Sequence, residues 1–499
     1  MPIKTDFKPS NPILAFASVT FSAWVFAISS TIANAVLPQM QGDLSASLDQ
    51  IAWVVTGSVV AGAIGLPPTP WLASRFGLKR LLIWCLILSS ATAVMTGFST
   101  SLSEVVFWRV CQSFFGAPIM VLAQTVTLNS FSIEKRGHAM AIWSVALTTG
   151  WVFAPTLGAF LVELESWRLI FFILGPLGLA AIFLCYVFLP SDKDDQSMRF
   201  DWWGFIALAV FIISVQMIFN RGHRLDWFES TEIMIWSIVS LISLYVYGVH
   251  TLTGINSFIR WRCFRDRNLS LGLIITAFFS FISLVPLVLI PTMLENLRGM
   301  ALITIGLVIM PRGVVQMVTT MLMGAIVNKI DPRIPITCGF LIFALSCHMM
   351  ASYNLNFGPW DLILPVALQG LGVSMIWMPT FHLLYLTLDP ELRTDGATML
   401  GLVYSMSSSG AVALVVTLLA RGTQTSNEEL VGYLIPGNEL LKLSEYSSWN
   451  TSDGESLAHM QTEVGIQALM IGYVNVWWLV MIVSLSAIPI ALLAKGRKK

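Results

Sequence analysis

The sequence has very little charge for its length. Of its 499 residues, only 11% are charged and 56% are apolar, whereas an ordinary soluble domain is about a quarter charged. So few charges cannot cover the surfaces of the roughly two to four soluble domains that this length would otherwise form. The sequence therefore predicts an integral membrane protein, with the lipid bilayer as its main solvent.

Several functional classes lack the residues that they need. The formal net charge is zero, so no basic face is available for nucleic acid. The six cysteines form no CxxC pair, which argues against a disulfide framework or a zinc site. No phosphate-binding GxxxxGK[ST] loop, HExxH motif or cluster of intramembrane acids occurs. We therefore expect neither an enzyme nor a nucleotide-driven pump, and no cofactor.

What the sequence does have is a series of long apolar runs. A membrane-spanning helix needs about 20 apolar residues, and continuous runs favour helices over a barrel with alternating residues. The sequence thus predicts an all-α polytopic membrane protein with fourteen spans. The runs lie at about 9–42, 51–71, 81–101, 104–128, 138–162, 168–190, 202–220, 231–256, 269–292, 301–327, 335–357, 362–388, 396–420 and 467–494.

The distribution of Lys and Arg predicts the orientation. Alternate connections, starting with the N-terminus, hold 20 of these residues, the opposite connections hold 6, and Arg109 and Arg312 fall inside spans. Because basic residues concentrate on the cytoplasmic side, both termini are predicted to be cytoplasmic. The longest connection, 421–466, then lies outside, as a solvated loop or a small docking surface.

A faint internal repeat divides the chain. The basic loops that begin at Arg75 and Lys329 are 254 residues apart, and Gln112 and Gln369 are 257 apart. Transporters often have two related halves around a central site. The repeat predicts two six-helix bundles, 1–190 and 269–499, with two extra helices inserted in 191–268.

Two intramembrane features indicate function or close packing. An Arg inside a span, such as Arg109, is costly unless it faces protein or water, although it could also snorkel from the helix end. In the run Gly150–Gly158, the small residues Gly150, Ala154 and Gly158 share one helix face, and Pro155 removes a backbone hydrogen bond. That face suits either a moving interface or ordinary packing.

These motifs, in this order, resemble the fourteen-span drug:proton antiporter branch, of the EmrB type, of the major facilitator superfamily. The resemblance covers almost the whole chain and implies the two-bundle fold of that family with alternating access. It assigns the cytoplasmic gating loop to Arg75, Gly77 and Lys79, within Pro70–Arg80. It also implies that Arg109 and Gln112, within Arg109–Pro118, assist proton coupling.

One departure from the branch concerns energy coupling. The branch usually has an acid where this chain has Ser29, and a serine hydroxyl does not titrate in the physiological range. His382 is a candidate proton carrier, because its ordinary pKa is about 6.5, or else it is packed against a backbone carbonyl. We therefore expect an atypical proton dependence.

The predicted activity is efflux of amphipathic small molecules, such as drugs or toxic compounds, across the inner membrane of a bacterium. The alternatives are a dedicated exporter of an endogenous metabolite such as a siderophore, a transporter-like sensor, and a membrane-embedded enzyme. Relatives of this type usually work with a periplasmic adaptor and an outer-membrane channel, which the outer loop could meet. The candidate substrate-cavity residues are Trp24, Asn34, Gln124, Trp143, Trp151, Gln316, Trp377 and Tyr404.

Overall fold

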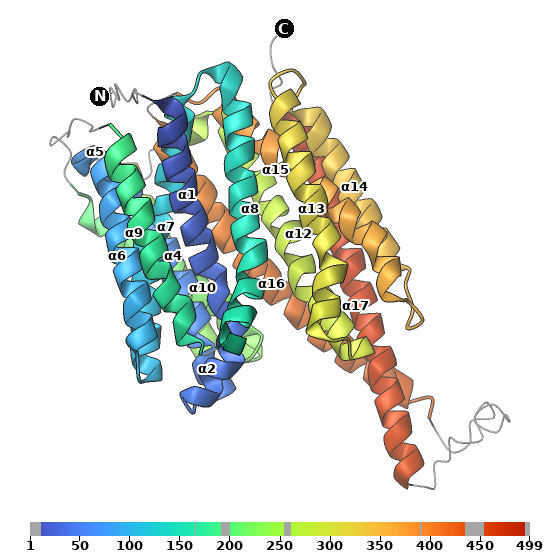
Figure 1. The fold of residues 1–499 in the computed structure, drawn as a ribbon. Helices are drawn as coiled ribbons and strands as arrows, with labels where there is room; N and C mark the ends of the chain where they lie inside the picture. The colour runs from blue at the N-terminus through green and yellow to red at the C-terminus, as the bar shows by residue number, and fades with distance from the viewer. Residues whose placement is uncertain are drawn as a thin grey trace.

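The computed structural model describes residues 11–164, 166–190, 200–253, 261–389, 392–434 and 454–494, and it places no strand among them. Each of the fourteen predicted spans contains one main helix (Figure 1). These helices are α1 (Pro12–Thr31), α4 (Trp53–Gly65), α6 (Leu78–Phe98), α7 (Leu102–Ser130), α8 (Ile133–Leu164), α9 (Arg168–Phe188), α10 (Trp202–Gly222), α11 (Thr231–Thr253), α12 (Arg267–Arg298), α13 (Leu302–Ile326), α14 (Arg333–Ala351), α15 (Ile363–Leu386), α16 (Arg393–Val431) and α17 (Gly454–Leu493).

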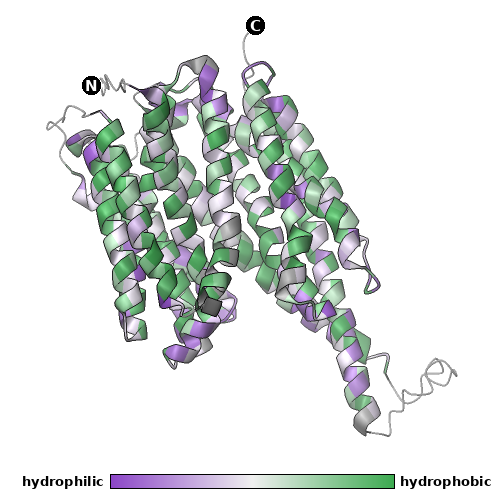
Figure 2. Ribbon diagram, in the orientation of Figure 1, coloured by the Kyte–Doolittle hydropathy of each residue, from purple (hydrophilic) through white to green (hydrophobic). Residues whose placement is uncertain are grey.

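The helices differ in length. Twelve of the described helices are long and apolar enough to cross a membrane. Helix α4 is a shorter apolar helix, and α8 has 32 residues. Figure 2 shows apolar residues along the middle of the helices and polar residues gathered toward their ends. The short elements are η1 (Ile32–Val36), α2 (Leu37–Asp43), α3 (Leu48–Ile51), α5 (Thr69–Phe76), η2 (Trp227–Glu229), η3 (Trp261–Arg265) and η4 (Pro359–Leu362).

The second predicted span is divided in two. Helix α4 ends before Pro67 and Pro68, and α5 begins at Thr69. Proline has no backbone N–H and disfavours helix in the residue before it, so the adjacent prolines interrupt the run. The Thr69 hydroxyl donates to the Gly65 carbonyl at 3.1 Å, which satisfies one of the acceptors that the break leaves free.

The predicted outer loop is partly helical. Residues 421–431 continue α16 and residues 454–466 belong to α17, so these helices have 39 and 40 residues. At about 1.5 Å per residue, each is close to twice as long as a bilayer core is thick. They therefore extend beyond the span, at the end opposite the labelled termini (Figure 1). Residues 435–453 lie outside the described part.

The helix contacts fall into groups. Helices α1, α4, α6, α7, α8 and α9 pack among themselves, and so do α12 to α17, while α10 pairs with α11 and contacts α4 and α16. This grouping is compatible with two bundles and an inserted pair. The bundle boundaries at 190 and 268 stay a prediction.

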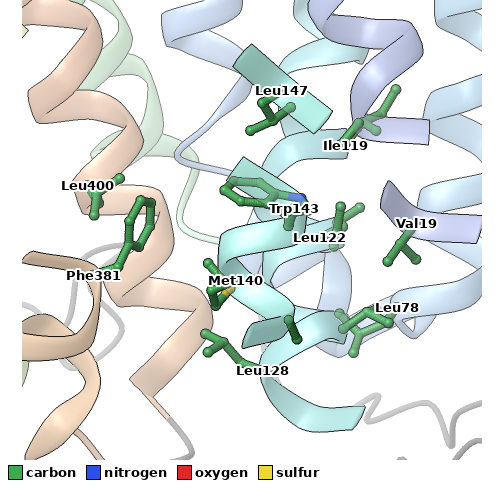
Figure 3. Close-up of a cluster of buried hydrophobic side chains, with 14 of the residues drawn as sticks. Val19, Leu78, Ile119, Leu122, Leu128, Met140, Trp143, Leu147, Phe381 and Leu400 are labelled. Carbon is green, nitrogen blue, oxygen red and sulfur yellow. The ribbon is translucent and has the colours of Figure 1, made fainter. Parts of the chain in front are cut away.

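A shared apolar core joins the two groups near one end. Its buried members include Met140, Trp143 and Leu128 from the first half and Phe381 and Leu400 from the second (Figure 3). The rings of Trp143 and Phe381 meet edge to face, with centroids 6.1 Å apart. This core lies toward the end at which α1 begins and α17 ends, and α8 and α13 diverge toward the other end (Figure 1).

Candidate functional site

A closed polar cluster lies inside the first half, where α1 and α7 meet. Arg109 donates to the Ser29 backbone carbonyl at 3.1 Å and to the Gln112 side-chain carbonyl at 2.9 Å. The Gln112 amide donates to the Ser29 hydroxyl at 2.6 Å. Three of the predicted coupling residues are thus brought together by one set of hydrogen bonds.

The Arg109 guanidinium is buried rather than snorkelling. The residue is 1% exposed, and its guanidinium carbon Cζ lies 5.8 Å from the centre of the Phe171 ring. No carboxylate pairs with it among the residues that the structure describes, and its Nε has no hydrogen-bond partner there. A buried charge without a counterion costs several kcal/mol in the membrane. Its retention at that cost points to a role other than stability.

The loop between α5 and α6 turns at a glycine. Gly77 has φ 82° and ψ 153°, a conformation that only glycine adopts without strain. Lys79 follows, and its ammonium donates to the Leu189 carbonyl beyond α9 at 2.7 Å and lies 5.2 Å from the Tyr186 ring centre. Lys79 therefore contacts the end of a neighbouring helix within the same half, and its gating role stays a prediction.

Ser74 stands where the family has an acid in this loop. Its hydroxyl donates to the Trp71 carbonyl at 2.8 Å within α5, so this position supplies a local helix contact instead of a carboxylate. Arg75 lies in the last turn of α5.

The small-residue face of α8 is packed against α1. A Cβ on Gly150 would lie 2.9 Å from the Ala27 Cβ and 3.2 Å from the Trp24 carbonyl oxygen, so glycine permits the two backbones to approach. Ala154 and Gly158 are buried further along the same helix. Helix α8 continues through Pro155, whose side chain lies outside the described part.

Hydrogen bonds join the two halves across the shared core. The Gln124 amide on α7 donates to the Tyr385 hydroxyl on α15 at 3.1 Å. Arg393, at the start of α16, donates to the Asn129 side-chain carbonyl at 3.2 Å. Gln124 is 3% exposed. It is therefore buried in the contact between the halves, and its role in a substrate cavity stays a prediction.

Helices α8 and α13 also meet at this end through two glycines. A Cβ on Gly324 would lie 2.3 Å from the Ala141 Cβ and 2.9 Å from the Gly137 carbonyl oxygen. Any side chain there would separate the helices. The contact is thus as tight as backbones allow.

Other candidate cavity residues gather in the second half. The Trp377 ring on α15 stacks on Phe279 of α12 at 4.7 Å and lies 5.7 Å from the Tyr404 ring of α16. These aromatic side chains form a wall between three helices. Trp377 and Tyr404 are half-buried.

The remaining predicted residues are spread more widely. Gln316 is half-buried on α13, and its backbone carbonyl accepts from Ser374 at 2.7 Å. Trp151 packs on the shared core, and His382 is half-buried on α15 beside Phe381. The side chain of Asn34 lies outside the described part.

Comparison with known proteins identifies the family. Residues 19–414 match the sequence model of the Major Facilitator Superfamily. The chain belongs to the Major Facilitator Superfamily. The fold agrees, since the solved proton:xylose symporter XylE superposes with a TM-score of 0.65 at 13% sequence identity, covering 98% of this chain and 97% of that one.

Named relatives match this transporter over nearly its full length. The multidrug export protein EmrB of Haemophilus influenzae is 28% identical over 94% of this chain and 92% of its own length. The probable multidrug resistance protein EmrY of Escherichia coli is 30% identical, over 86% and 84%. The fatty acid resistance protein FarB of Neisseria gonorrhoeae is 27% identical, over 98% of each chain.

Sequence reasoning missed several partners in this transporter. Tyr385 and Asn129 carry no local motif, because their role depends on a helix distant in sequence. Asp43 likewise accepts from the Trp167 indole at 2.8 Å and pairs with Arg168 at 3.4 Å. No local motif connects Asp43 with these two residues, which are 124 and 125 positions away in the sequence.

Proposed function

We propose that this transporter is a secondary active exporter that works by alternating access. The observation that carries the proposal is that the two halves contact each other at one end. Gln124–Tyr385, Asn129–Arg393 and the contact at Gly324 all lie toward the end at which α1 begins and α17 ends. A contact confined to one end can open while the other end closes, which is how two bundles expose a central site alternately.

The proposed substrates are amphipathic small molecules. The wall formed by Phe279, Trp377 and Tyr404 offers flat apolar surface with a polar edge, and such mixed linings suit ligands with an apolar body and a few polar groups. The names of the relatives, which refer to multidrug export and fatty acid resistance, support this substrate class.

We further propose an inner-membrane location with both termini in the cytoplasm, as the excess of Lys and Arg in alternate connections indicates. The sealed end is then cytoplasmic and the structure faces outward. Helices α16 and α17 extend beyond the span on the outer side. That extension is the proposed docking surface for a periplasmic adaptor that leads to an outer-membrane channel.

We propose that export is driven by proton antiport with atypical coupling. Ser29 supplies the cluster around Arg109 with a hydroxyl and a carbonyl but no carboxylate, so this cluster lacks the usual proton carrier. A proton carried by His382 or a charged substrate driven by the membrane potential would replace it. The potential contributes about 2.3 kcal/mol per charge per 100 mV.

Transport in proteoliposomes tests this proposal. The purified protein would be assayed with an anionic dye, anilinonaphthalene sulfonate, and a cationic dye, ethidium, under an imposed pH gradient or an imposed potential, each alone. We expect dye movement with a weak response to the pH gradient. We expect a stronger response in Ser29→Asp, which places a carboxylate against Arg109.

Two results would contradict the proposal. If neither dye moves under the pH gradient or under the potential, the exporter assignment is wrong. Full transport on the pH gradient alone, unchanged in His382→Ala, would remove both atypical coupling and the histidine as carrier.

A further inference from the structure

A second buried arginine lies in the second half. Arg312 on α13 is 3% exposed, and its Nη2 donates to the Ser283 backbone carbonyl of α12 at 2.5 Å. Its Nη1 is buried without a hydrogen-bond partner, and no carboxylate pairs with it among the residues that the structure describes. One side of this guanidinium therefore has no acceptor within the described part of the protein.

A buried amide without a partner lies one helix away. Gln369 on α15 is fully buried, and neither its Oε1 nor its Nε2 has a partner. The backbones of α13 and α15 touch beside it, since a Cβ on Gly370 would lie 2.2 Å from the Arg312 carbonyl oxygen. Buried polar groups nearly always have hydrogen-bond partners. An arginine and a glutamine on contacting helices that both have buried atoms without partners therefore suggest a ligand that bonds to both.

The equivalent groups of the first half bond to one another. Ser29 and Ser283 are 254 residues apart, Gln112 and Gln369 are 257 apart, and in each half an arginine donates to the carbonyl of the serine. In the first half, Gln112 closes the cluster by bonding both Arg109 and Ser29. In the second half the arginine comes from a different helix and the glutamine bonds neither. The same groups thus form a closed cluster in one half and an open one in the other.

The open cluster lies close to the aromatic wall. Phe279 is one turn before Ser283 on α12, and it stacks on Trp377 at 4.7 Å. Tyr404 lies 5.7 Å from Trp377, and Arg312 bonds Ser283, one turn beyond Phe279 on the same helix. A cation and an apolar wall therefore adjoin.

We propose that Arg312 and Gln369 bind the carboxylate of an amphipathic organic anion whose apolar body lies on Phe279, Trp377 and Tyr404. The guanidinium binds a carboxylate through paired N–H groups, and the Gln369 amide donates to the same group. The bound charge compensates the buried cation, which has no protein counterion. This inference rests on the proposed function and names the substrate class of that exporter.

Ligands that differ only in their head group test the site. Octanoate, 1-octanol and octylammonium would be titrated into the purified full-length protein in lipid nanodiscs, in chloride-free buffer, by calorimetry. We expect octanoate to bind about tenfold tighter than octanol, as one charge-assisted hydrogen-bonded pair warrants. Arg312→Gln should abolish that difference and leave octanol binding unchanged.

Three further variants separate binding from folding. Arg312→Lys keeps the charge and should retain part of the preference for octanoate. Gln369→Leu removes the unsatisfied amide, so it should raise the thermal unfolding temperature while weakening octanoate binding about threefold. Arg421→Gln, at an exposed position on α16, is the matched control and should bind like the wild type.

Unchanged octanoate preference in Arg312→Gln would overturn the proposal. If that variant does not fold, unchanged preference in Gln369→Leu would do so. Chloride that displaces octanoate at equal concentration would also overturn it, because the site would then hold an inorganic anion. If octanoate binds as expected but no dye is transported, the exporter assignment fails and the anion site stands.

Discussion

At the scale of single residues, buried polar groups without ionic partners set this transporter apart from a purely structural helix bundle. Arg109 and Arg312 are each at most 3% exposed, and each donates to the backbone carbonyl of a serine. Backbone carbonyls satisfy hydrogen bonds but leave the charge uncompensated. Each site therefore stays responsive to an incoming negative charge.

Replacing Arg109 tests whether its charge serves transport. Arg109→Gln removes a charge that costs about 2.5–3.5 kcal/mol at mid-membrane, and it loses hydrogen bonds worth about 1.5–3 kcal/mol each. Two such hydrogen bonds are lost, together about 3–6 kcal/mol, so the removed charge offsets much of the loss and we expect a thermal unfolding temperature only a few degrees below the wild type. Dye efflux should fall about tenfold or more, if one charged interaction is lost from the working cycle.

Arg421→Gln is the control for this measurement as well. Equal efflux by the Arg109→Gln and Arg421→Gln proteins, at equal amounts in the membrane, would show that the buried charge is not needed.

At the scale of elements, the contact between α8 and α13 decides which end is closed. Gly137 and Gly324 let the two backbones touch, and further contacts at Trp143 and Phe381 lie close by. An interface built on glycine has no side chain to adjust, so even a methyl group must move the helices apart.

Gly324→Ala should therefore favour opening of the sealed end. Its Cβ would lie 2.3 Å from the Ala141 Cβ, and overpacking of this kind costs about 1–3 kcal/mol, or roughly tenfold in the ratio of two states. The measurement is thiol labelling of a cysteine introduced at Asn129, which should become faster. Gly306→Ala on the same helix is the matched control, because nothing lies within 4 Å of its Cβ. Equal labelling rates in the two variants would contradict the role of this contact.

At the scale of the whole molecule, the start of α1 and the end of α17 lie on the same side (Figure 1), as an even number of spans requires. The structure fixes this relative arrangement, and the charge bias predicts which side is cytoplasmic.

Labelling with an impermeant maleimide tests the orientation. In a background without the partly exposed Cys111 and Cys338, we expect a cysteine at Glu428, on the exposed extension of α16, to react in intact cells. A cysteine at Arg265, in η3 on the opposite side, should react only after permeabilisation. The reverse pattern would invert the topology and place the sealed end outside.

The sequence by itself determined the membrane class, the fourteen helices and the repeat. In lipid the backbone groups must be satisfied internally, by helices or by a closed barrel, and continuous rather than alternating apolar runs select helices. The motifs also identified Arg109, Gln112 and Gly77 as special positions, and the structure shows the reason for each in a hydrogen bond or a backbone angle. These features depend on residues close together in the chain.

Only the tertiary structure decided how distant residues combine. Ser29 and Arg109 are 80 positions apart, and Gln124 and Tyr385 are 261 apart, so no local pattern could pair them. The sequence also could not show that one nitrogen of Arg312 is buried without a partner in the described part of the chain, or that α16 and α17 extend into the predicted outer loop. Burial and unpaired hydrogen-bonding groups are properties of packed helices, because they depend on what every neighbouring helix supplies.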